Sequence, residues 1–476
     1  MKKTITSVLS VIIVIAGALM LGAVTAGAVG FAGGDGSEGN PYQVSTPEQL
    51  NEVRNYLDAH FIQINDIDME TATVNFEGWL PMGNYGKPFI GTYDGGGFAI
   101  NKFRISWKPI PQFFLVGLFG VNGGTIKNLG MKDGYISENS SNSEVTIGSI
   151  AGYNKGTISN CYNTGVVSAS PSLTVMRNTS NAGGIAGRND GVIENCYNSG
   201  DVVSFADRDS YAGGITGSNI GTNSGVGVIK NCYNTGDVFS SSSSTISALR
   251  YAAYAGGIAG GNRVPLYGGP IENCYNTGRI SASGLISNAY VGGISGEDIY
   301  NTSNCYWNID SDQIRNNIPL ENKNKKGVGN ESGTTTPLTS EEMKDKNNYK
   351  GFDFNTVWRF KSGVNDGYPV LRAFYTKPEI LSITPDGSGV TVNIDNTPAG
   401  SVLVAAVYDG RGRMLAVKYE TIEQNGDIPV PVDIGSGVKI KAMLWDGINT
   451  IKPLCEAATI IKDNTGNWKL ATGNFN

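Results

Sequence analysis

Histidine and charged residues are scarce in this sequence. Its 476 residues include one histidine, His60, and charged residues make up only 16%. Zinc sites built from several histidines, and the HExxH motif of metalloproteases, need imidazoles that are absent here. A Ser/His catalytic pair would have to use His60, which we interpret as part of an N-terminal cap. The net charge of -6 argues against the basic face that nucleic-acid binding requires. We therefore predict no metal, no other cofactor and no nucleic-acid partner.

The first residues have the form of an export signal. Met1-Lys2-Lys3 precedes an apolar run from Val8 to Val24, and small residues follow at Ala26 and Ala28. This pattern is typical of a secretory signal peptide, which we assign to residues 1–28. The apolar run is also long enough to remain as an uncleaved membrane anchor. We expect a mature chain that is secreted or associated with the cell surface.

Glycine is abundant, with 65 residues, and it marks an internal repeat. The phrase Ile-x-Asn-Cys-Tyr-Asn-x-Gly begins at Ile158, Ile193, Ile229 and Ile271, and a shortened copy begins at Ser303. A Gly-x-Ile-x-Gly phrase precedes each copy. Counted from Leu129, which occupies the cysteine position of an earlier coil, the steps are 32, 35, 36, 42 and 31 residues. Steps of this size are typical of a solenoid.

The segments inside each repeat are short, β-branched and separated by Gly or Asn, and none has helical spacing. They predict three short strands per coil. Coils stacked as parallel strands about 4.8 Å apart form a parallel β-helix, an all-β solenoid.

The repeated phrase predicts where its side chains point. Simple alternation would bury a polar residue between Ile193 and Cys196, so we place a bend at Asn195, because asparagine tolerates left-handed backbone geometry. Isoleucine and cysteine then both point inward, and the following tyrosine points outward. The asparagines at this position are predicted to stack as a ladder of amides; they are Asn128, Asn160, Asn195, Asn231, Asn273 and Asn304.

The stacking also predicts the state of the cysteines. Thiols one rung apart have Cβ atoms close to the rung spacing, about 4.8 Å, whereas a disulfide needs about 3.5 to 4.5 Å. We therefore predict buried free thiols in the column formed by Cys161, Cys196, Cys232, Cys274 and Cys305. Cys455 lies alone in another domain.

Sequence patterns divide the rest of the chain. Residues 29–115 are predicted to form an N-terminal cap and the first coils, with a helix that starts at Thr46-Pro47-Glu48-Gln49 and buries Leu50, Val53 and Leu57. Residues 116–308 contain the repeats.

The C-terminal part contains two further segments. Residues 309–376 are predicted to form a mobile linker and a C-terminal cap, in which a short helix starts at Thr339 and residues 352–371 close the solenoid. Residues 377–476 alternate as short strands and predict a β-sandwich, with a hairpin turn at Asp409-Gly410-Arg411-Gly412.

These residues resemble the bacterial GLUG-motif proteins, named for the phrase that stands here as Gly117-Leu118-Phe119-Gly120 and recurs with Ile for Leu. The flanking runs Phe89 to Gly97 and Tyr368-Pro369-Val370-Leu371 also match what accompanies such repeats. The resemblance implies a right-handed parallel β-helix and a surface or adhesion role. The last domain is similar to a fibronectin-III-like or immunoglobulin-like appendage. Some members of the family carry an IgA-cleaving metalloprotease domain, but no HExxH is present here.

Two functions are open. The first is a non-catalytic, adhesin-like protein that binds glycans or extracellular proteins, which we expect to be monomeric. The second is a polysaccharide lyase or glycoside hydrolase, which would need paired carboxylates. The candidate pairs are Asp190 with Glu194, Asp207 with Asp209, Glu297 with Asp298, and Asp310 with Asp312.

The outward tyrosines are the candidate binding residues. Functionally, Tyr162, Tyr197, Tyr233, Tyr275 and Tyr306 could stack on sugar rings along a polysaccharide. Structurally, tyrosines stacked between rungs would only stabilise the sheet. The long inserts at Ser168–Thr179 and Ser240–Tyr254 are a second place for specificity, because loops on a rigid scaffold often carry binding residues.

Overall fold

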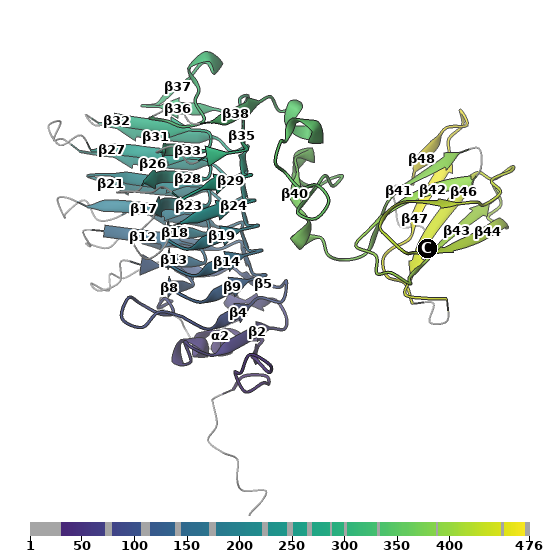
Figure 1. Cartoon of the computed structure of the whole chain (residues 1–476), viewed down its shortest axis with the longest axis horizontal. Helices are drawn as coiled ribbons and strands as arrows, with labels where there is room; N and C mark the ends of the chain where they lie inside the picture. The colour runs from purple at the N-terminus through teal and green to yellow at the C-terminus, as the bar shows by residue number, and fades with distance from the viewer. Residues whose placement is uncertain are drawn as a thin grey trace, which may run out of the picture. The chain divides into compact units, whose positions relative to one another are not determined.

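A computed structural model describes residues 30–71, 79–105, 115–138, 144–170, 178–220, 227–244, 251–263, 269–285, 288–298, 302–330, 334–386, 389–448 and 452–471. The predicted signal peptide lies outside these ranges, as do residues 171–177 and 245–250 of the two long inserts. Within the described ranges, no helix has the length and hydropathy of a membrane span. The chain divides into two compact units, residues 1–371 and residues 372–476, seen in Figure 1.

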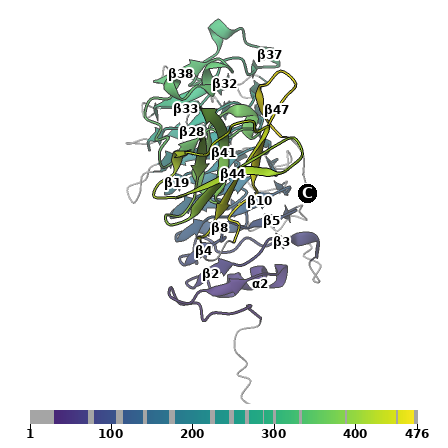
Figure 2. The ribbon, with the colours of Figure 1, turned by 90° about the vertical axis from the view of Figure 1, so that its right-hand side faces the viewer.

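Unit 1 (residues 1–371) is a parallel β-helix in which five sheets run along the stack of coils. The chain passes through sheets 1 to 5 in order and then enters the next coil. Figures 1 and 2 show the coils stacked from α2 at one end to β37 at the other. The predicted all-β fold with a parallel β-helix is confirmed.

The strands of each sheet are given in spatial order. Sheet 1 contains β1 (Tyr42–Val44), β2 (His60–Gln63), β4 (Thr92–Asp94), β9 (Thr125–Lys127), β14 (Thr157–Ser159), β19 (Val192–Glu194), β24 (Val228–Lys230), β29 (Ile271–Glu272) and β34 (Thr302–Ser303). Sheet 2 contains β3 (Ile67–Asp68), β5 (Ala99–Asn101), β10 (Gly130–Lys132), β15 (Tyr162–Asn163), β20 (Tyr197–Asn198), β25 (Tyr233–Asn234), β30 (Tyr275–Asn276), β35 (Cys305–Asn308) and β38 (Thr335–Leu338). Sheet 3 contains β6 (Arg104–Ile105), β11 (Tyr135–Glu138), β16 (Val166–Ala169), β21 (Val202–Ala206), β26 (Val238–Ser242), β31 (Ile280–Gly284), β36 (Gln313–Arg315) and β37 (Ile318–Pro319).

The other two sheets have six strands each. Sheet 4 contains β7 (Leu115–Val116), β12 (Glu144–Gly148), β17 (Thr179–Gly183), β22 (Ser210–Gly213), β27 (Ala252–Gly256) and β32 (Asn288–Gly292). Sheet 5 contains β8 (Phe119–Asn122), β13 (Ala151–Asn154), β18 (Ala186–Asn189), β23 (Thr216–Ile220), β28 (Ala259–Arg263) and β33 (Ser295–Asp298).

The prediction of three strands per coil is wrong, because each coil bends at more corners than the asparagine alone provides. In one coil the asparagine corner at Asn160 separates sheets 1 and 2, and Gly165 separates sheets 2 and 3. Further on, Gly184 separates sheets 4 and 5, and Gly191 leads back into sheet 1. Glycine suits these corners because the coils approach closely there: a Cβ on Gly184 would lie 2.2 Å from the carbonyl oxygen of Gly214.

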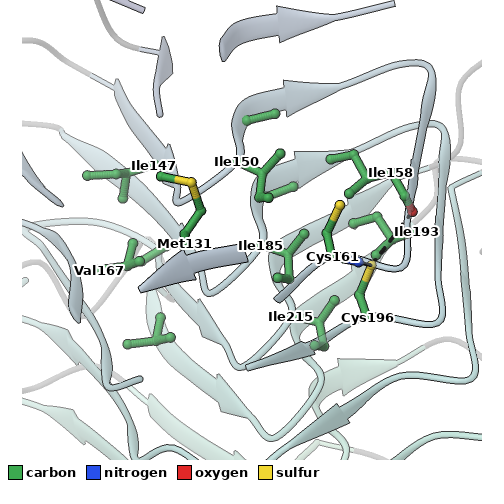
Figure 3. Packing of buried hydrophobic residues seen from close by; sticks show 14 of the residues in the cluster. Met131, Ile147, Ile150, Ile158, Cys161, Val167, Ile185, Ile193, Cys196 and Ile215 are labelled. Atoms are coloured by element: carbon green, nitrogen blue, oxygen red, sulfur yellow. Dashed lines mark hydrogen bonds between the residues drawn. The ribbon is translucent and has the colours of Figure 1, made fainter. Parts of the chain in front are cut away.

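Equivalent residues of the repeat lie directly over one another. Ile158 pairs with Ile193, Ile193 pairs with Ile229, and Tyr162 pairs with Tyr197. The isoleucine and cysteine side chains are fully buried. Figure 3 shows Cys161 and Cys196 packed in this core with the isoleucines of neighbouring rungs. The inward direction predicted for both residue types is confirmed.

The predicted asparagine corner is also present. All six asparagines before the cysteine position have a left-handed backbone, with φ between 50° and 53°. Their amides bond along the stack: Asn160 Nδ2 donates to Asn128 Oδ1 at 3.0 Å, and Asn231 Nδ2 donates to Asn195 Oδ1 at 3.1 Å. The bend turns the strand and returns the following cysteine to the core.

Two further asparagine ladders were not predicted. In the first, each Nδ2 except that of the last member donates to the Oδ1 of the next coil at 2.8 to 2.9 Å, and its members are Asn122, Asn154, Asn189, Asn219 and Asn262. In the second the corresponding distance is 2.8 Å, and its members are Asn163, Asn198, Asn234 and Asn276. These side chains are buried, so the amide-to-amide bonds satisfy polar groups that would otherwise destabilise the core.

All six cysteines are free thiols, as predicted, and the five of the repeat are fully buried. Each repeat thiol donates to the carbonyl oxygen two residues earlier; for Cys196 the partner is Glu194 at 3.1 Å. The backbone N–H of Cys161 donates a hydrogen bond to Cys196 Sγ, with 3.4 Å between nitrogen and sulfur. Burial, with a smaller contribution from the neighbouring thiols, raises the pKa of Cys196 and Cys274 well above the usual range.

The N-terminal cap starts as predicted. Thr46 Oγ1 accepts a hydrogen bond from Gln49 N, and α2 (Pro47–Glu52) follows. The helix is shorter than the sequence predicts, because it continues as the 3-10 turn η1 (Val53–Asn55). Leu50, Val53 and Leu57 are nevertheless all buried. A second 3-10 turn, η2 (Met69–Thr71), follows β3.

The segment predicted to begin as a mobile linker instead extends the β-helix. Strand β36 pairs with β31, and β38 pairs with β35. Between them lie β37, which is antiparallel to β36, and the 3-10 turn η4 (Asn322–Asn324). The charged residues that suggested a linker lie outward, whereas Gln313 and Val328 are each only 2% exposed.

The predicted helix at Thr339 is one 3-10 turn, η5 (Glu342–Lys344), in which Thr339 Oγ1 accepts from Glu342 N at 3.2 Å. The segment continues through η6 (Lys346–Asn348), β39 (Trp358–Arg359), η7 (Asn365–Gly367) and β40 (Val370–Leu371), with β39 and β40 antiparallel. We call residues 349–371 the lateral cap, because it covers part of sheet 2.

Unit 2 (residues 372–476) is an antiparallel β-sandwich that begins with the 3-10 turn η8 (Arg372–Phe374). Sheet 6 contains β41 (Glu379–Asp386), β42 (Gly389–Asp395) and β45 (Gly426–Val430). Sheet 7 contains, in spatial order, β44 (Met414–Thr421), β43 (Val402–Tyr408), β46 (Lys439–Trp445), β47 (Ala458–Lys462) and β48 (Trp468–Leu470). Val392 of sheet 6 and Leu403 and Leu444 of sheet 7 belong to its core.

Candidate functional site

The predicted tyrosine column exists on the outer side of sheet 2. The rings of Tyr162, Tyr197, Tyr233 and Tyr275 stack with centroid distances of 4.9 to 5.0 Å and angles of 1° to 6° between planes. A Cβ on Gly130, one coil earlier, would lie 2.3 Å from the Tyr162 ring, so that ring covers the Gly130 backbone. Neighbouring rings therefore occupy the faces that a sugar would need for stacking.

The upper part of the column is also buried under the lateral cap. Tyr275 Oη donates to the Pro369 carbonyl at 2.5 Å and accepts from Asn365 Nδ2 at 2.7 Å. The Trp358 ring lies 5.7 Å from Tyr275 and 6.1 Å from Tyr233.

The last ring of the column is enclosed in the same way. Tyr306 Oη donates to the Lys350 carbonyl at 3.0 Å, and its ring contacts Tyr349 and Phe352. Burial raises the pKa of Tyr275, Tyr306 and Tyr349. Only Tyr162 and Tyr197 remain half-exposed, so the geometry favours the structural interpretation of the column.

The candidate carboxylate pairs are engaged in structural hydrogen bonds. Asp207 Oδ1 accepts from Asn178 N at 2.5 Å, and Asp209 Oδ1 accepts from Ala252 N at 3.0 Å. Asp310 Oδ2 accepts from Ser340 N at 2.8 Å, and Glu297 Oε1 accepts from Asn330 Nδ2 at 3.2 Å.

Other sequence-derived candidates are placed apart from one another. Glu194 lies on the outer side of sheet 1, opposite Lys230, and His60 lies in β2 next to Thr92. In the described part of the chain, no group of three or more His, Cys, Asp or Glu side chains could hold a metal ion.

A different group of side chains gathers on the outer side of sheet 5. We call it the Tyr153 cluster; its members are Tyr85, Tyr153, Lys155, Arg188 and Asp190. Tyr153 of β13 pairs with Arg188 of β18 in the next coil. Tyr85 comes from a turn joined to β8 at both ends, because Met82 bridges to Phe119 and Phe89 bridges to Asn122. The stacked coils therefore bring together residues that are far apart in the sequence.

Asp190 holds the cluster together. Its carboxylate accepts from Tyr153 Oη at 2.5 Å, from Arg188 Nε at 2.9 Å and from Arg188 Nη2 at 3.0 Å. The guanidinium carbon lies 4.7 Å from the centre of the Tyr153 ring, and Lys155 Nζ lies 5.9 Å from it. Tyr85 packs edge-to-face on Tyr153, with centroids 5.6 Å apart, and is 53% exposed.

The electrostatics fix the protonation states. Burial, helped by the hydrogen bond to Asp190, raises the pKa of Tyr153, so the phenol stays protonated at neutral pH. Burial alone would lower the pKa of Arg188, but the bonds to Asp190 and its negative charge raise it overall. Burial also raises the pKa of Tyr85. The result is an exposed neutral ring beside a fixed guanidinium with further N–H groups.

The sequence contains a signal for part of this cluster. In the phrase Gly-x-Asn of sheet 5, the flanking residues recur while the middle residue varies; it is Tyr153, Arg188, Ser218 or Gly261 in successive coils. This outward position is therefore where the surfaces of successive coils differ. Tyr85 could not have been found in this way, since it lies outside the repeat.

A family model described as the GLUG motif matches residues 178–203, which span strands β17 to β20 and part of β21. The chain carries the GLUG motif. The matched residues form nearly one complete coil, and the GLUG repeat is therefore the structural unit that stacks in unit 1.

Two curated relatives match part of this sequence. A protein named as a Gly-rich membrane protein from Evansella cellulosilytica is 36% identical over 134 residues, which cover 27% of this chain and 15% of that protein. Halomucin from Haloquadratum walsbyi is 28% identical over 145 residues, which cover 29% of this chain and 2% of that protein. The matches thus span less than a sixth of either relative.

One solved structure is similar to this chain. It is a crystal structure described as an immunoglobulin A1 protease from Bacteroides ovatus, with a TM-score of 0.48 and 21% identity. The alignment covers 72% of this chain and 95% of that one.

Proposed function

We propose that this chain is an exported, surface-associated, adhesin-like protein that binds glycan without catalysis, and that the Tyr153 cluster is its binding site. The single observation that carries the proposal is the exposed Tyr85 ring held beside the Arg188–Asp190 pair. The export signal and the names of the relatives, a membrane protein and halomucin, support a place at the cell surface.

The chemistry of the cluster suits a sugar ring. One face of a pyranose carries C–H bonds, which are attracted to the negative face of an aromatic ring. Tyr85 offers such a surface, since it is 53% exposed. Its edge-to-face contact with Tyr153 orients the ring before a ligand arrives, and this reduces the entropy lost on binding.

The polar part of the cluster would bind the hydroxyl groups. Asp190 uses two of the five N–H groups of Arg188, and no hydrogen bond from Nη1 to a described residue is found. A guanidinium fixed by a carboxylate can donate paired hydrogen bonds to adjacent sugar hydroxyls. Lys155, which is exposed, adds a positive charge beside the same ring.

The test is a glycan array with the chain lacking residues 1–28, followed by calorimetry with the best ligand. Tyr85→Ala and Arg188→Lys are expected to weaken binding at least tenfold, because the first removes the ring and the second removes the guanidinium. Phe205→Ala is the matched control: it removes a ring that is 40% exposed on sheet 3, and binding should remain unchanged.

Three results would contradict the proposal. They are a failure to bind any glycan, full affinity in Tyr85→Ala, or release of reducing ends or unsaturated products from the ligand. If Tyr197→Ala abolished binding and Tyr85→Ala did not, the ligand would bind the tyrosine column instead. Thermal unfolding of each variant checks that the fold is intact.

A further inference from the structure

Strand β44 (Met414–Thr421) is an edge strand of sheet 7. It pairs with β43 on one side, and no described strand pairs with its other side. Figure 1 shows β44 beyond β43 at the border of this sheet. A row of backbone N–H and C=O groups along an eight-residue edge is a template for another strand.

The side chains of β44 are exposed on both faces. Leu415, Val417 and Tyr419 are 46%, 49% and 57% exposed and point to the outer side of sheet 7. Lys418 and Glu420 lie on the other side, because they face Ala405 and Leu403 of the core. Neither charge forms an ion pair with a described residue.

These two charges restrict what can pair with the edge. A lysine that points toward the inner side of an edge strand opposes pairing with most strands, because its charge would be left without a partner. A suitable strand must place a carboxylate opposite Lys418 and a cation opposite Glu420. The charges also lie two residues apart, so they share one face.

β44 itself meets this requirement. When two copies pair antiparallel about a two-fold axis through Tyr419, residue 418 of one faces residue 420 of the other. Two Lys418–Glu420 pairs form at once, Tyr419 faces Tyr419, and Val417 faces Thr421. Opposite charges across strands stabilise a sheet, whereas a register with Lys418 facing Lys418 is destabilised. The same patch is used on both chains, as a two-fold interface requires.

We propose that the chain forms a homodimer through antiparallel β44–β44 pairing in this register. The two copies of sheet 7 join into one continuous sheet, and the apolar rows of the two copies meet at Tyr419. The structure thus assigns to unit 2 an assembly role that is independent of glycan binding by unit 1. It replaces the expectation of a monomer drawn from the sequence.

Sedimentation velocity of the chain lacking residues 1–28 tests the dimer. Lys418→Glu places two carboxylates opposite each other and should raise the dimer dissociation constant at least tenfold. The double variant Lys418→Glu/Glu420→Lys exchanges the charges and should restore dimerisation. Lys377→Glu is the matched control, since it makes the same charge change at an exposed position of unit 2 outside β44.

Cross-linking tests the register. In a Cys455→Ser background, Tyr419→Cys should form an intermolecular disulfide with itself under mild oxidation, because the two-fold axis passes through this residue. Val417→Cys should not, but it should cross-link to Thr421→Cys when the two are mixed. A chain that is monomeric at all concentrations, or a dimer that persists in Lys418→Glu, would overturn the proposal.

Discussion

At the scale of single residues, the asparagine before each repeat cysteine has two structural functions. Its left-handed backbone, with φ of 51° at Asn195, turns the strand and returns the cysteine to the core. Its amide bonds to the equivalent amide in a neighbouring coil. Glycine could supply the first function but not the second, and most other residues would supply neither.

Substitution of Asn195 separates these functions. Asn195→Ala should lower the free energy of unfolding by about 2 to 3 kcal/mol, because alanine is strained in the left-handed region and the ladder bond is lost. Asn195→Gly should cost about 1 kcal/mol, since only the ladder bond is lost. Urea unfolding measures both, and an alanine variant as stable as the glycine variant would contradict the assigned role of the backbone.

The thiol column predicts selective reactivity. The five repeat cysteines are fully buried, whereas Cys455 is half-buried. A water-soluble disulfide reagent should therefore modify at most one thiol per folded chain, slowly, since burial raises the pKa of Cys455. In denaturant all six should react. Modification of several thiols per folded chain would show that the column of repeat cysteines is open to solvent.

At the scale of elements, the sequence repeat correctly predicted the features that recur in every coil of the stack. These are the parallel strands, the asparagine corner, and the inward Ile193 and Cys196. Such features follow from sequence because each copy meets the same neighbours. The predicted number of strands per coil was wrong. The hydrophobic pattern does not show where one strand ends at the glycine corners, such as Gly165 and Gly184.

Features made by residues outside the repeat could not be predicted. The lateral cap places Trp358 against Tyr233 and Tyr275, rungs that precede it by more than 80 residues. Nothing in the local sequence says whether such an aromatic segment covers the end or the side of a solenoid. The Tyr153 cluster depends in the same way on Tyr85, whose place is set by the bridge from Phe89 to Asn122.

The buried phenols and thiols predict how stability changes with pH. The pKa values of Cys196, Cys274, Tyr153 and Tyr275 are raised in the folded chain, so the unfolded chain releases these protons first as pH increases, and this favours unfolding. Stability should be constant from neutral pH to about 8.5, decline as unfolded thiols ionise, and fall more steeply above about pH 10, where unfolded tyrosines ionise.

Urea unfolding between pH 7 and 11 measures this decline, and absorbance at 295 nm follows the phenolates. Tyr275→Phe supplies the control: it should be less stable at neutral pH, because the bond to the Pro369 carbonyl is lost, but its decline above pH 10 should be shallower. Equal slopes in the two proteins would mean that Tyr275 ionises normally when folded.

At the scale of the whole molecule, unit 1 is a one-dimensional stack in which each coil contacts mainly the coils on either side. Every sheet continues from coil to coil with equivalent positions of the repeat paired, for example Tyr197 with Tyr233 and Tyr233 with Tyr275. The lengths of the connections vary between coils, but the paired positions do not. A coil is therefore a unit that could be removed without changing the register of the rest.

Deletion of residues 196–231 tests this property. It joins Asn195 to Cys232 and restores the phrase Ile-x-Asn-Cys-Tyr-Asn, so Tyr162 would stack on Tyr233 and β19 would pair with β29. The shortened chain should fold cooperatively with a lower unfolding temperature, because one coil-to-coil interface is lost.

Deletion of residues 196–213 is the control. It removes half as many residues but places Gly214 at the cysteine position, and it should prevent folding. Circular dichroism and thermal unfolding distinguish the two, and equal behaviour would mean that register does not determine the stability of the stack.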